Sequence, residues 1–344
     1  MSLSTGKTEA DSQKAQGGDP AKPRRLVFMG TPEFALPGLK ALLAAPEFEV
    51  VGVFTAPDKP VGRRQIPTPS AVKIAAQRAG LKIFQPEKIR PETETIRTLA
   101  PDLIVVIAYG HIIPPDILSL PTYGCLNVHG SLLPRYRGAA CLNAPILNGD
   151  DKTGITIMKM DAGLDTGPIL RQAEMKLDGR ETLTSLHDRL AKLSAEILVP
   201  TIRAYVAGEI EPRAQDNTKA SYVKMLKKED GLIDWRKPAA AIERMVRAYN
   251  PWPGAYFTSR GKIIKIMEVE PKILKTGSGT KESGNNAPGA PKISEPGAPK
   301  AGEMFLARGK LAVQCGADAL VISRLQPAGK KIMTAKEFIS GYKI

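Results

Sequence analysis

One short segment, Asp102–Tyr109 with the sequence DLIVVIAY, constrains the fold of this 344-residue chain more than any other. Its continuous run of aliphatic residues is typical of a strand that is buried on both faces. Such strands lie at the centre of parallel sheets whose two faces are covered by helices. We therefore expect an α/β domain built around this segment.

Strands and helices alternate in the sequence ahead of that segment. We predict strands over 25–29 and 49–54, with a helix between them that has Thr31 as its N-cap and Pro32 at its first position. Ser70 is predicted to cap a later helix. This order predicts a doubly wound, mostly parallel sheet. The turn after the first strand lacks Gly-x-Gly-x-x-Gly, which counts against a dinucleotide site.

The pattern of predicted helices and strands changes near residue 215. Before it, we predict helices over 139–147 and 181–207, separated by a strand over 154–160. After it, one helix and several short alternating strands suit a small open β-barrel of the oligonucleotide-binding type. The predicted organisation is a disordered tail over 1–24, an α/β domain over 25–208, a linker over 209–218 and a β-barrel domain over 219–344, with a disordered low-complexity insertion over 275–302.

Positive charge is concentrated in the last third of the chain. Residues 215–344 hold 23 Lys and Arg against 12 Asp and Glu, whereas residues 1–214 hold 26 against 23. A basic module attached to a nearly neutral one suggests a polyanionic partner, with nucleic acid the leading candidate. The alternative is a basic surface without a partner, and charge alone does not separate the two.

The three cysteines are an odd number without the spacing of a metal site. Such cysteines are typical of a protein in the reducing cytoplasm. We therefore expect neither a disulfide framework nor a bound metal. The sequence has no apolar run long enough to span a membrane, so we expect no membrane partner. The first 25 residues lack the apolar core of a signal peptide.

Two polar side chains two residues apart are the first candidates for chemistry. Asn127 and His129 lie on a predicted strand, so their side chains project from the same face. An amide and an imidazole at the carboxyl end of a strand can both point at one carbonyl oxygen, which suits the stabilisation of an oxyanion. The alternative is an asparagine at the edge of the core beside a hydrogen-bonded histidine.

A carboxylate in a later loop can join this pair. Asp165 lies between glycines, in a loop that is free to approach the edge of the sheet, although Asp161 remains an alternative acid. A neutral amine attacking an activated carbonyl needs such a set, with Asp165 orienting the imidazole and relaying the proton of the amine. His111 and His187 are interpreted as a loop and a helix-surface histidine.

Two aromatic residues are further candidates for a functional or packing role. Tyr136, between Arg135 and Arg137, suits either a base-stacking or phosphate-binding site or a helix entry with solvated arginines. Trp252, between two prolines, is interpreted as a packing anchor between domains.

A long connector over 55–69 contains four prolines and the sequence Gly-Arg-Arg at its tip. Long loops of compact domains are often functional. A guanidinium can bind phosphate or a base edge in a bidentate manner, so Arg63 and Arg64 are candidates for nucleic-acid contact.

Several short segments of the chain match the pattern of a known family. They are GTPEFA (30–35), PDKPVGR (57–63), LNVHGSLLPRYRGAA (126–140), DAGLDTGPI (161–169), IDW (233–235), NPWP (250–253) and GKKIM (329–333). The first four segments resemble folate-dependent formyl transferases in general, and the last three resemble the methionyl-tRNA formyltransferase family in particular. The resemblance covers residues 25–344 apart from the insertion. The chain departs from the family pattern after Ala140, where the family usually has Pro-Ile.

The resemblance implies a reaction and a set of residues. The reaction moves a formyl group from 10-formyltetrahydrofolate to the α-amine of methionine on initiator tRNA, in the cytoplasm, and we expect a monomer. The resemblance also implies that Arg63, with Arg64 beside it, belongs to a finger that guides the tRNA. The catalytic residues that it implies are Asn127, His129 and Asp165, and the folate site is lined by Ser131, Leu132, Leu133 and Pro134.

Three rival interpretations remain from the sequence. A folate formyltransferase acting on a small amine, such as glycinamide ribonucleotide or an amino sugar nucleotide, shares the catalytic set but needs no basic second domain. An RNA-binding protein with an inactive α/β domain is disfavoured by the intact set. A nicotinamide dehydrogenase is disfavoured by the missing glycine fingerprint.

Overall fold

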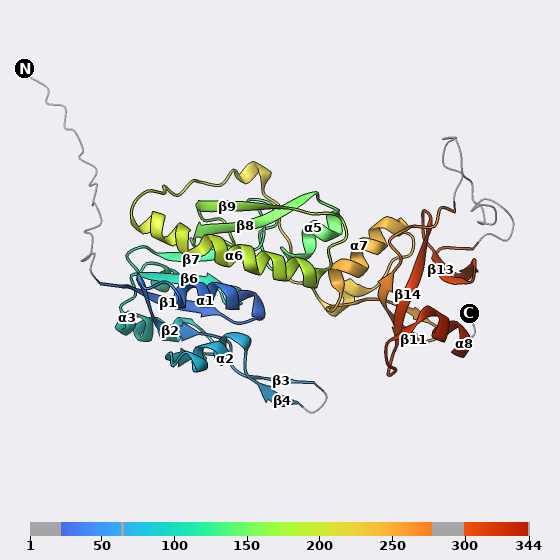
Figure 1. Cartoon of the computed structure of the whole chain (residues 1–344), viewed down its shortest axis with the longest axis horizontal. Helices are drawn as coiled ribbons and strands as arrows, with labels where there is room; N and C mark the ends of the chain where they lie inside the picture. The colour runs from blue at the N-terminus through green and yellow to red at the C-terminus, as the bar shows by residue number, and fades with distance from the viewer. Residues whose placement is uncertain (1–21, 63–64, 277–298, 343–344) are drawn as a thin grey trace, which may run out of the picture. The chain divides into compact units, whose positions relative to one another are not determined.

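The computed structural model describes residues 22–62, 65–276 and 299–342 (Figure 1). The chain divides into two compact units, residues 1–126 and 127–344, which are described separately. The predicted disordered tail and insertion fall mostly outside the described residues, and Arg63 and Arg64 fall there entirely. None of the helices in the described part of the chain combines the length and apolar character that crossing a membrane requires.

The first unit is built on a parallel sheet with the strand order β5–β2–β1–β6. All five residues of β6 are buried, as expected for the central strand that the sequence predicts. Parallel pairing and the intervening helices confirm the predicted α/β class. The strands are β1 (Arg24–Gly30), β2 (Phe48–Phe54), β5 (Ile83–Phe84) and β6 (Leu103–Ile107).

Short helices follow the strands of this unit. A 3₁₀ turn, Arg90–Glu92, leads into the third of them. Ser70 caps its helix as predicted, because its Oγ accepts a hydrogen bond from Lys73 N at 3.0 Å. The helices are α1 (Leu36–Leu43), α2 (Ala71–Arg78), α3 (Thr93–Leu99) and α4 (Pro115–Leu118).

The prediction that Thr31 caps a helix is wrong. A 3₁₀ turn, Glu33–Ala35, separates it from α1, and no side chain caps that turn. Thr31 Oγ1 instead donates to Tyr109 O at 3.4 Å and accepts from Ala56 N at 3.2 Å. The hydroxyl thereby satisfies backbone groups that follow β6 and β2, where the ladder of the sheet has ended.

The proline-rich connector forms a hairpin rather than an irregular loop. Strands β3 (Lys59–Val61) and β4 (Ile66–Thr68) pair antiparallel. Gly62 has a φ of +72°, and its carbonyl accepts hydrogen bonds from the backbone and side chain of Gln65. At the base of the hairpin, Asp58 binds Lys73 at 2.7 Å.

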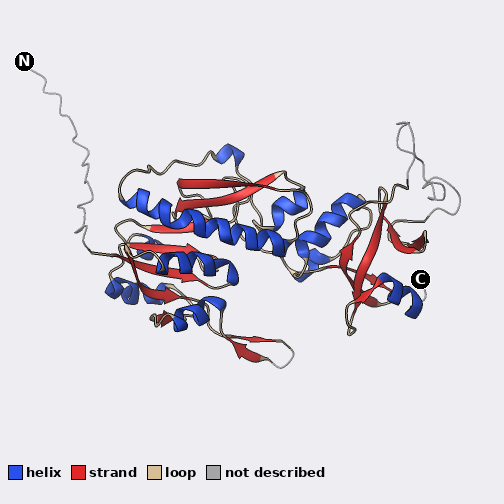
Figure 2. Ribbon diagram, in the orientation of Figure 1, coloured by secondary structure: helices blue, strands red, loops and turns tan. Residues whose placement is uncertain are grey.

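In the second unit, the sheet order is β7–β8–β9, with an antiparallel β8–β9 pair. Helix α6 lies alongside these last two strands (Figure 2). A capping box between Thr182 and Ser185 begins α6, close to the predicted start. The elements are β7 (Cys125–His129), α5 (Asn143–Asn148), β8 (Lys152–Lys159), β9 (Ile169–Lys176) and α6 (Leu183–Val206).

The helix predicted over 139–147 begins four residues later, at Asn143. The residues before it form turns that continue from β7. Asn143 Nδ2 donates to Ala248 O at 2.7 Å, which ties α5 to a helix of the C-terminal part of the unit.

The C-terminal part contains an antiparallel sheet with the order β10–β11–β14–β13–β12, and β15 pairs with β14. This confirms the prediction of a second domain of short antiparallel strands. Helix α8 (Ala335–Gly341), capped by Thr334, was not predicted. The other elements are α7 (Ala239–Tyr249), β10 (Ala255–Ser259), β11 (Lys262–Val269), β12 (Met304–Ala307), β13 (Lys310–Gln314), β14 (Ala319–Pro327) and β15 (Met333–Thr334).

Candidate active site

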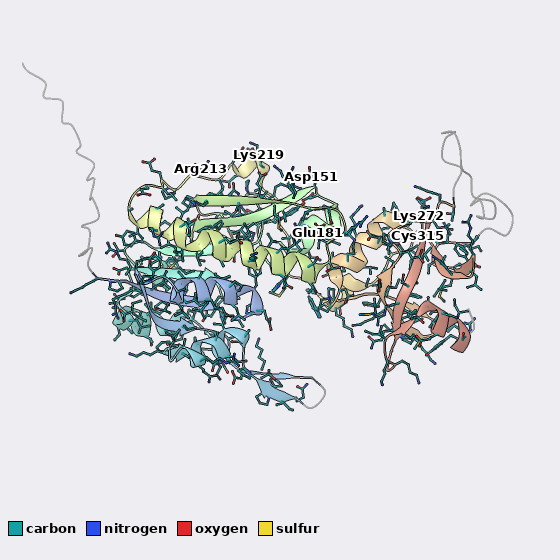
Figure 3. The ribbon with its side chains drawn as sticks, viewed as in Figure 1. Asp151, Glu181, Arg213, Lys219, Lys272 and Cys315 are labelled. Carbon is teal, nitrogen blue, oxygen red and sulfur yellow. The ribbon has the colours of Figure 1, made fainter. Side chains whose placement is uncertain are left out.

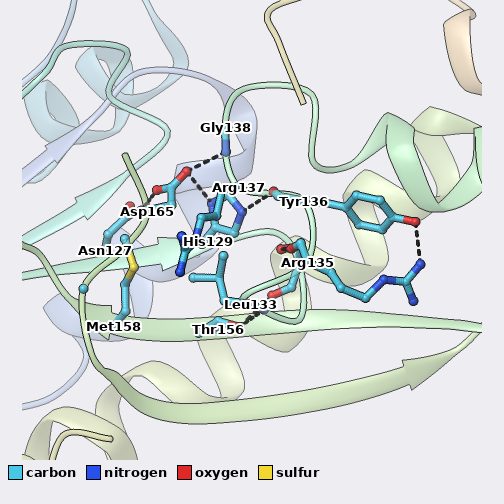
Figure 4. A network of polar contacts seen from close by, with 12 residues as sticks. Asn127, His129, Leu133, Arg135, Tyr136, Arg137, Gly138, Thr156, Met158 and Asp165 are labelled. Atoms are coloured by element: carbon cyan, nitrogen blue, oxygen red, sulfur yellow. Dashed lines mark hydrogen bonds and ion pairs between the residues drawn. The ribbon is translucent and has the colours of Figure 1, made fainter. Parts of the chain in front are cut away.

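The three predicted polar side chains meet at the end of β7 (Figure 4). Asn127 Nδ2 donates to Asp165 Oδ1 at 3.3 Å. His129 Nδ1 lies 3.5 Å from Asp165 Oδ2, and the imidazole is only 6% exposed. The structure thus brings together an amide, an imidazole and a carboxylate that the sequence separates by up to 38 residues.

The position of Asp165 is fixed through both its side chain and its backbone. Gly138 N donates to Asp165 Oδ2 at 2.8 Å. Gln215 Nε2 donates to Asp165 O at 2.8 Å and to Gly167 O at 2.7 Å. Asp165 has a φ of +54°, a left-handed conformation that aspartate adopts more readily than most residues. These contacts pre-orient the carboxylate before any substrate binds.

The imidazole of His129 is held at both nitrogens. Nε2 lies 2.9 Å from Tyr136 O. Because a carbonyl only accepts, this hydrogen bond requires a proton on Nε2. Nδ1 then faces Asp165, so a proton received on Nδ1 lies beside a carboxylate that can accept it in turn.

The structure separates the two aspartates that the sequence leaves as alternatives. Asp161 Oδ1 accepts hydrogen bonds from Gly163 N at 3.0 Å and from Thr166 Oγ1 at 2.6 Å. Asp161 therefore closes its own exposed turn, whereas Asp165 contacts the asparagine and the histidine.

The loop after β7 contains the residues that the resemblance assigns to a folate site. Ser131 is fully buried, and its Oγ donates to Arg135 O at 2.6 Å. Leu133 is 3% exposed and packs with Met158 and Ile169. The side chains of Ser131 and Leu133 therefore stabilise the loop from within, whereas Leu132 and Pro134 are half-buried.

Neither interpretation offered for Tyr136 describes its environment. Its ring is 7% exposed, so it is not free to stack on a base, and it does not begin a helix. The phenol donates to Asp150 Oδ2 at 2.7 Å, and Arg135 binds both groups. Burial raises the pKa of the Tyr136 phenol, and the hydrogen bond to Asp150 adds to the effect.

The two arginines beside Tyr136 differ, because Arg135 is exposed and Arg137 is buried. Arg137 is 2% exposed, and its guanidinium donates to Gln215 Oε1 at 2.8 Å, Asn217 Oδ1 at 2.7 Å and Tyr222 Oη at 2.9 Å. A buried guanidinium requires such a set of acceptors. Because Gln215 also binds the Asp165 loop, a chain of hydrogen bonds connects Arg137 to the backbone of Asp165.

Segment 215–223 lies against the loop that follows β7. Ser221 O accepts from Arg137 N at 2.8 Å, and Val223 N donates to Arg137 O at 2.8 Å. A Cβ placed on Gly138 would lie 2.4 Å from Val223 O, so only glycine allows this approach. Local sequence patterns do not indicate these contacts, since their partners are more than 75 residues apart.

A cysteine beside the site is not a nucleophile. Burial raises the pKa of the Cys141 thiol to about 12, and the charge of Asp165 adds to the effect. The thiol is therefore neutral near pH 7, and a thiol is far less nucleophilic than a thiolate.

The remaining aromatic and histidine candidates lie elsewhere. Trp252 is 53% exposed, so the prediction of a packing anchor is wrong. His187 Nδ1 lies 2.9 Å from its neighbour Asp188 on α6, as expected for a helix-surface histidine. His111 stacks near Tyr109, with ring centroids 4.9 Å apart.

Both parts of the chain are similar to known transferases. The family model described as formyl transferase matches residues 24–202, and its C-terminal domain model matches residues 225–343. The methionyl-tRNA formyltransferase of Citrifermentans bemidjiense is 47% identical over 322 residues, covering 93% of this chain and 94% of the relative.

Solved structures show the same fold at lower identity. Methionyl-tRNA formyltransferase from Clostridium thermocellum is 18% identical with a TM-score of 0.53, covering 72% of this chain and 94% of that one. HypX from Aquifex aeolicus, solved in complex with tetrahydrofolic acid, is 16% identical with a TM-score of 0.59. The alignment with HypX covers 92% of this chain but only 47% of the longer one.

Proposed function

The chain belongs to the methionyl-tRNA formyltransferase family, and from this premise we propose that it formylates the α-amine of methionine on initiator tRNA, with 10-formyltetrahydrofolate as the donor. The observation that carries the proposal is the meeting of Asn127, His129 and Asp165 at the end of β7. This set suits acyl transfer to a neutral amine, and the product supports translation initiation.

The proposed reaction assigns each side chain a role. The amine nitrogen forms a bond to the formyl carbon, the bond from that carbon to N10 of the folate breaks, the amine loses a proton and N10 gains one. Asn127 donates the second hydrogen of its Nδ2 to the formyl oxygen, where negative charge develops, and His129 adds a donor once its Nδ1 has received a proton. Asp165 orients His129 and accepts the proton that the amine loses.

A folate donor is supported by both the loop and the comparisons. Leu132 and Pro134 are half-buried in the loop after β7, where they offer apolar surface beside the catalytic set. HypX, which shares the fold, is described as a complex with tetrahydrofolic acid. We propose that residues 131–134 line the folate site, through the backbone at Ser131 and Leu133, whose side chains are buried.

We propose the domain organisation and setting that follow from this function. A catalytic domain over 25–208 and a basic domain over 219–344, joined by a linker, provide separate surfaces for the reacting end and the body of a tRNA. The excess positive charge after residue 215 supports this division. The enzyme acts as a monomer in the cytoplasm, where charged tRNA enters translation.

A substrate comparison tests the proposal directly. Labelled formyl donor is supplied with methionyl initiator tRNA, methionyl elongator tRNA, free methionine or an amino sugar nucleotide. We expect rapid label transfer to the initiator tRNA alone. Preferred transfer to the amino sugar nucleotide or another small amine would instead support the rival function, which shares the catalytic set.

The hairpin supplies a second, separate prediction. Arg63 follows Gly62 in the sequence, and we propose that it contacts the tRNA. Arg63→Ala should lower kcat/KM for charged tRNA by about 5- to 150-fold, the cost of one lost base or phosphate contact. The KM for folate should stay within about twofold, because Arg63 is proposed to contact the tRNA and not the folate. Arg64→Ala, the matched control, should have a smaller effect on the tRNA.

Steady-state kinetics with each substrate varied in turn checks this assignment. An unchanged kcat/KM for charged tRNA in Arg63→Ala, or a rise in the folate KM alone, would show that the hairpin serves the folate site instead.

A further inference from the structure

The C-terminal part of the second unit presents a tryptophan at its surface. Trp252 is 53% exposed and lines a shallow pocket of about 150 Å³. Tryptophan is highly buried on average, so a half-exposed indole that lines a pocket is a candidate contact for a partner. The pocket is lined by Lys228, Trp252, Pro253, Tyr256, Ile263 and Lys265.

The turn that carries Trp252 is anchored on both sides. Asn250 Nδ2 donates to Met267 O at 2.9 Å, and Gly254 N donates to Tyr249 O at 2.8 Å. The turn is thus fixed against β11 and the end of α7. A fixed backbone limits the conformational entropy that the indole loses when a partner packs on it.

Two lysines flank the indole and leave their charges unpaired. Among the described residues, neither Lys228 nor Lys265 forms an ion pair, whereas nearby Lys224 lies 3.6 Å from Asp230. A Cβ placed on Gly254 would lie 3.5 Å from Lys265 Nζ, so this ammonium lies over the backbone of the turn. The lining of the pocket therefore combines aromatic side chains with two ammonium groups.

We propose that this pocket binds an unpaired nucleotide of the tRNA, with its base stacked on Trp252 and its phosphates near Lys228 and Lys265. The inference rests on the proposed function and deepens it by assigning a recognition subsite. Single-stranded nucleic acids are bound by this combination of aromatic platforms and positive charge, because every base has a face that stacks. A paired base offers no free face, so the pocket selects unpaired positions.

The charge of the pocket argues against a second copy of this chain as its occupant. Self-association through a two-fold interface would bring the lysines of both copies close together, and like charges oppose such contact. A polyanion has the complementary charge, in keeping with the net positive charge of residues 215–344.

Tryptophan fluorescence can report on Trp252 alone, because the chain has two tryptophans and the other one can be replaced. Trp235 packs edge-on against Phe257, with ring centroids 5.3 Å apart, and Trp235→Phe keeps an aromatic ring there. Trp252 is then the only tryptophan. Titration of this variant with uncharged initiator tRNA should quench its fluorescence saturably, and a blunt RNA duplex should quench it far less.

Binding affinities provide the quantitative test. Trp252→Ala should weaken binding of uncharged initiator tRNA by about 5- to 150-fold, the usual cost of one lost stacking contact, and Trp252→Phe should retain most of the affinity. The matched control is Leu306→Ala, which removes a side chain with 54% exposure from β12, at the opposite edge of the sheet. That variant should bind within about twofold of the unmodified chain, because surface substitutions away from a site have small effects.

The lysines are tested by salt dependence. Lys265→Gln should reduce the slope of log affinity against log salt concentration by about one. Lys272→Gln is the control, since Lys272 follows β11 and does not line the pocket (Figure 3). Thermal unfolding of each variant checks that the fold is retained.

The proposal is overturned if Trp252 fluorescence does not respond to the tRNA, or if Trp252→Ala binds like Leu306→Ala. It is also overturned if Trp252→Ala changes the oligomeric state, which would assign the surface to a second copy. These readouts need neither charged tRNA nor folate. If the chain formylates initiator tRNA but the Trp252 variants show neither effect, only the nucleotide pocket is refuted. If the chain formylates only small amines, the proposed function is refuted.

Discussion

The His129→Ala variant is expected to lower kcat for formyl transfer by about 10²–10⁴-fold, the usual contribution of a positioned acid–base group. In the structure, the imidazole is buried, bound to Tyr136 O and directed at Asp165. Its removal takes away both a donor for the formyl oxygen and the group that Asp165 orients. Asn127→Ala is expected to cost about 10²–10³-fold, as for the loss of one oxyanion donor.

Single-turnover kinetics with charged initiator tRNA measures this effect, and circular dichroism checks the fold. His187→Ala is the control, because this histidine lies on α6 beside Asp188, away from the catalytic set. Its rate should match that of the unmodified enzyme. A His129→Ala enzyme with a normal rate would refute the assignment of the catalytic residues.

Arg137→Met should lower the free energy of unfolding by about 3 kcal/mol and reduce kcat as well. The substitution removes the charged donor of three hydrogen bonds, each worth about 1.5–3 kcal/mol, although the acceptors on the exposed Asn217 and Tyr222 can bind water instead. Water that enters the space offsets part of this cost. The rate falls because Gln215 loses the contact that orients its amide toward the Asp165 loop.

Two further variants separate the effects of Arg137 on stability and rate. Arg236→Met removes an arginine with 85% exposure that is paired with Asp234, so it should cost less than about 1 kcal/mol. Gln215→Leu should lower kcat, with a smaller change in the KM for either substrate. If Arg137→Met is destabilised but fully active, the hydrogen-bond chain is structural and does not position the carboxylate.

The sequence predicts those features that depend on local periodicity. The buried run of β6 identifies the central strand, and alternation along β7 places Asn127 and His129 on one face. The Ser70 cap is found for the same reason, because its partner is three residues away. Family resemblance then favours Asp165, whereas local pattern alone leaves Asp161 open.

Features that depend on distant partners escape such reasoning. Arg137 has the local sequence of a solvated arginine, but its acceptors lie 78 to 85 residues further along the chain. Thr31 has the pattern of an N-cap, yet its hydroxyl binds backbone groups from two other segments. In both cases, contacts with distant residues determine where the side chain lies. The neighbouring residues in the sequence do not indicate these contacts.

The contacts of segment 215–223 bear on how freely this enzyme can be divided or recombined. A chain cut after α6 retains Asn127, His129 and Asp165, but it loses the Gln215 amide that fixes the backbone of Asp165. We therefore expect a chimera that exchanges the C-terminal domain to retain activity only if it keeps residues 215–223 of this chain. Those residues follow α6, the last helix of the α/β fold, but they hold the loop that contains Asp165.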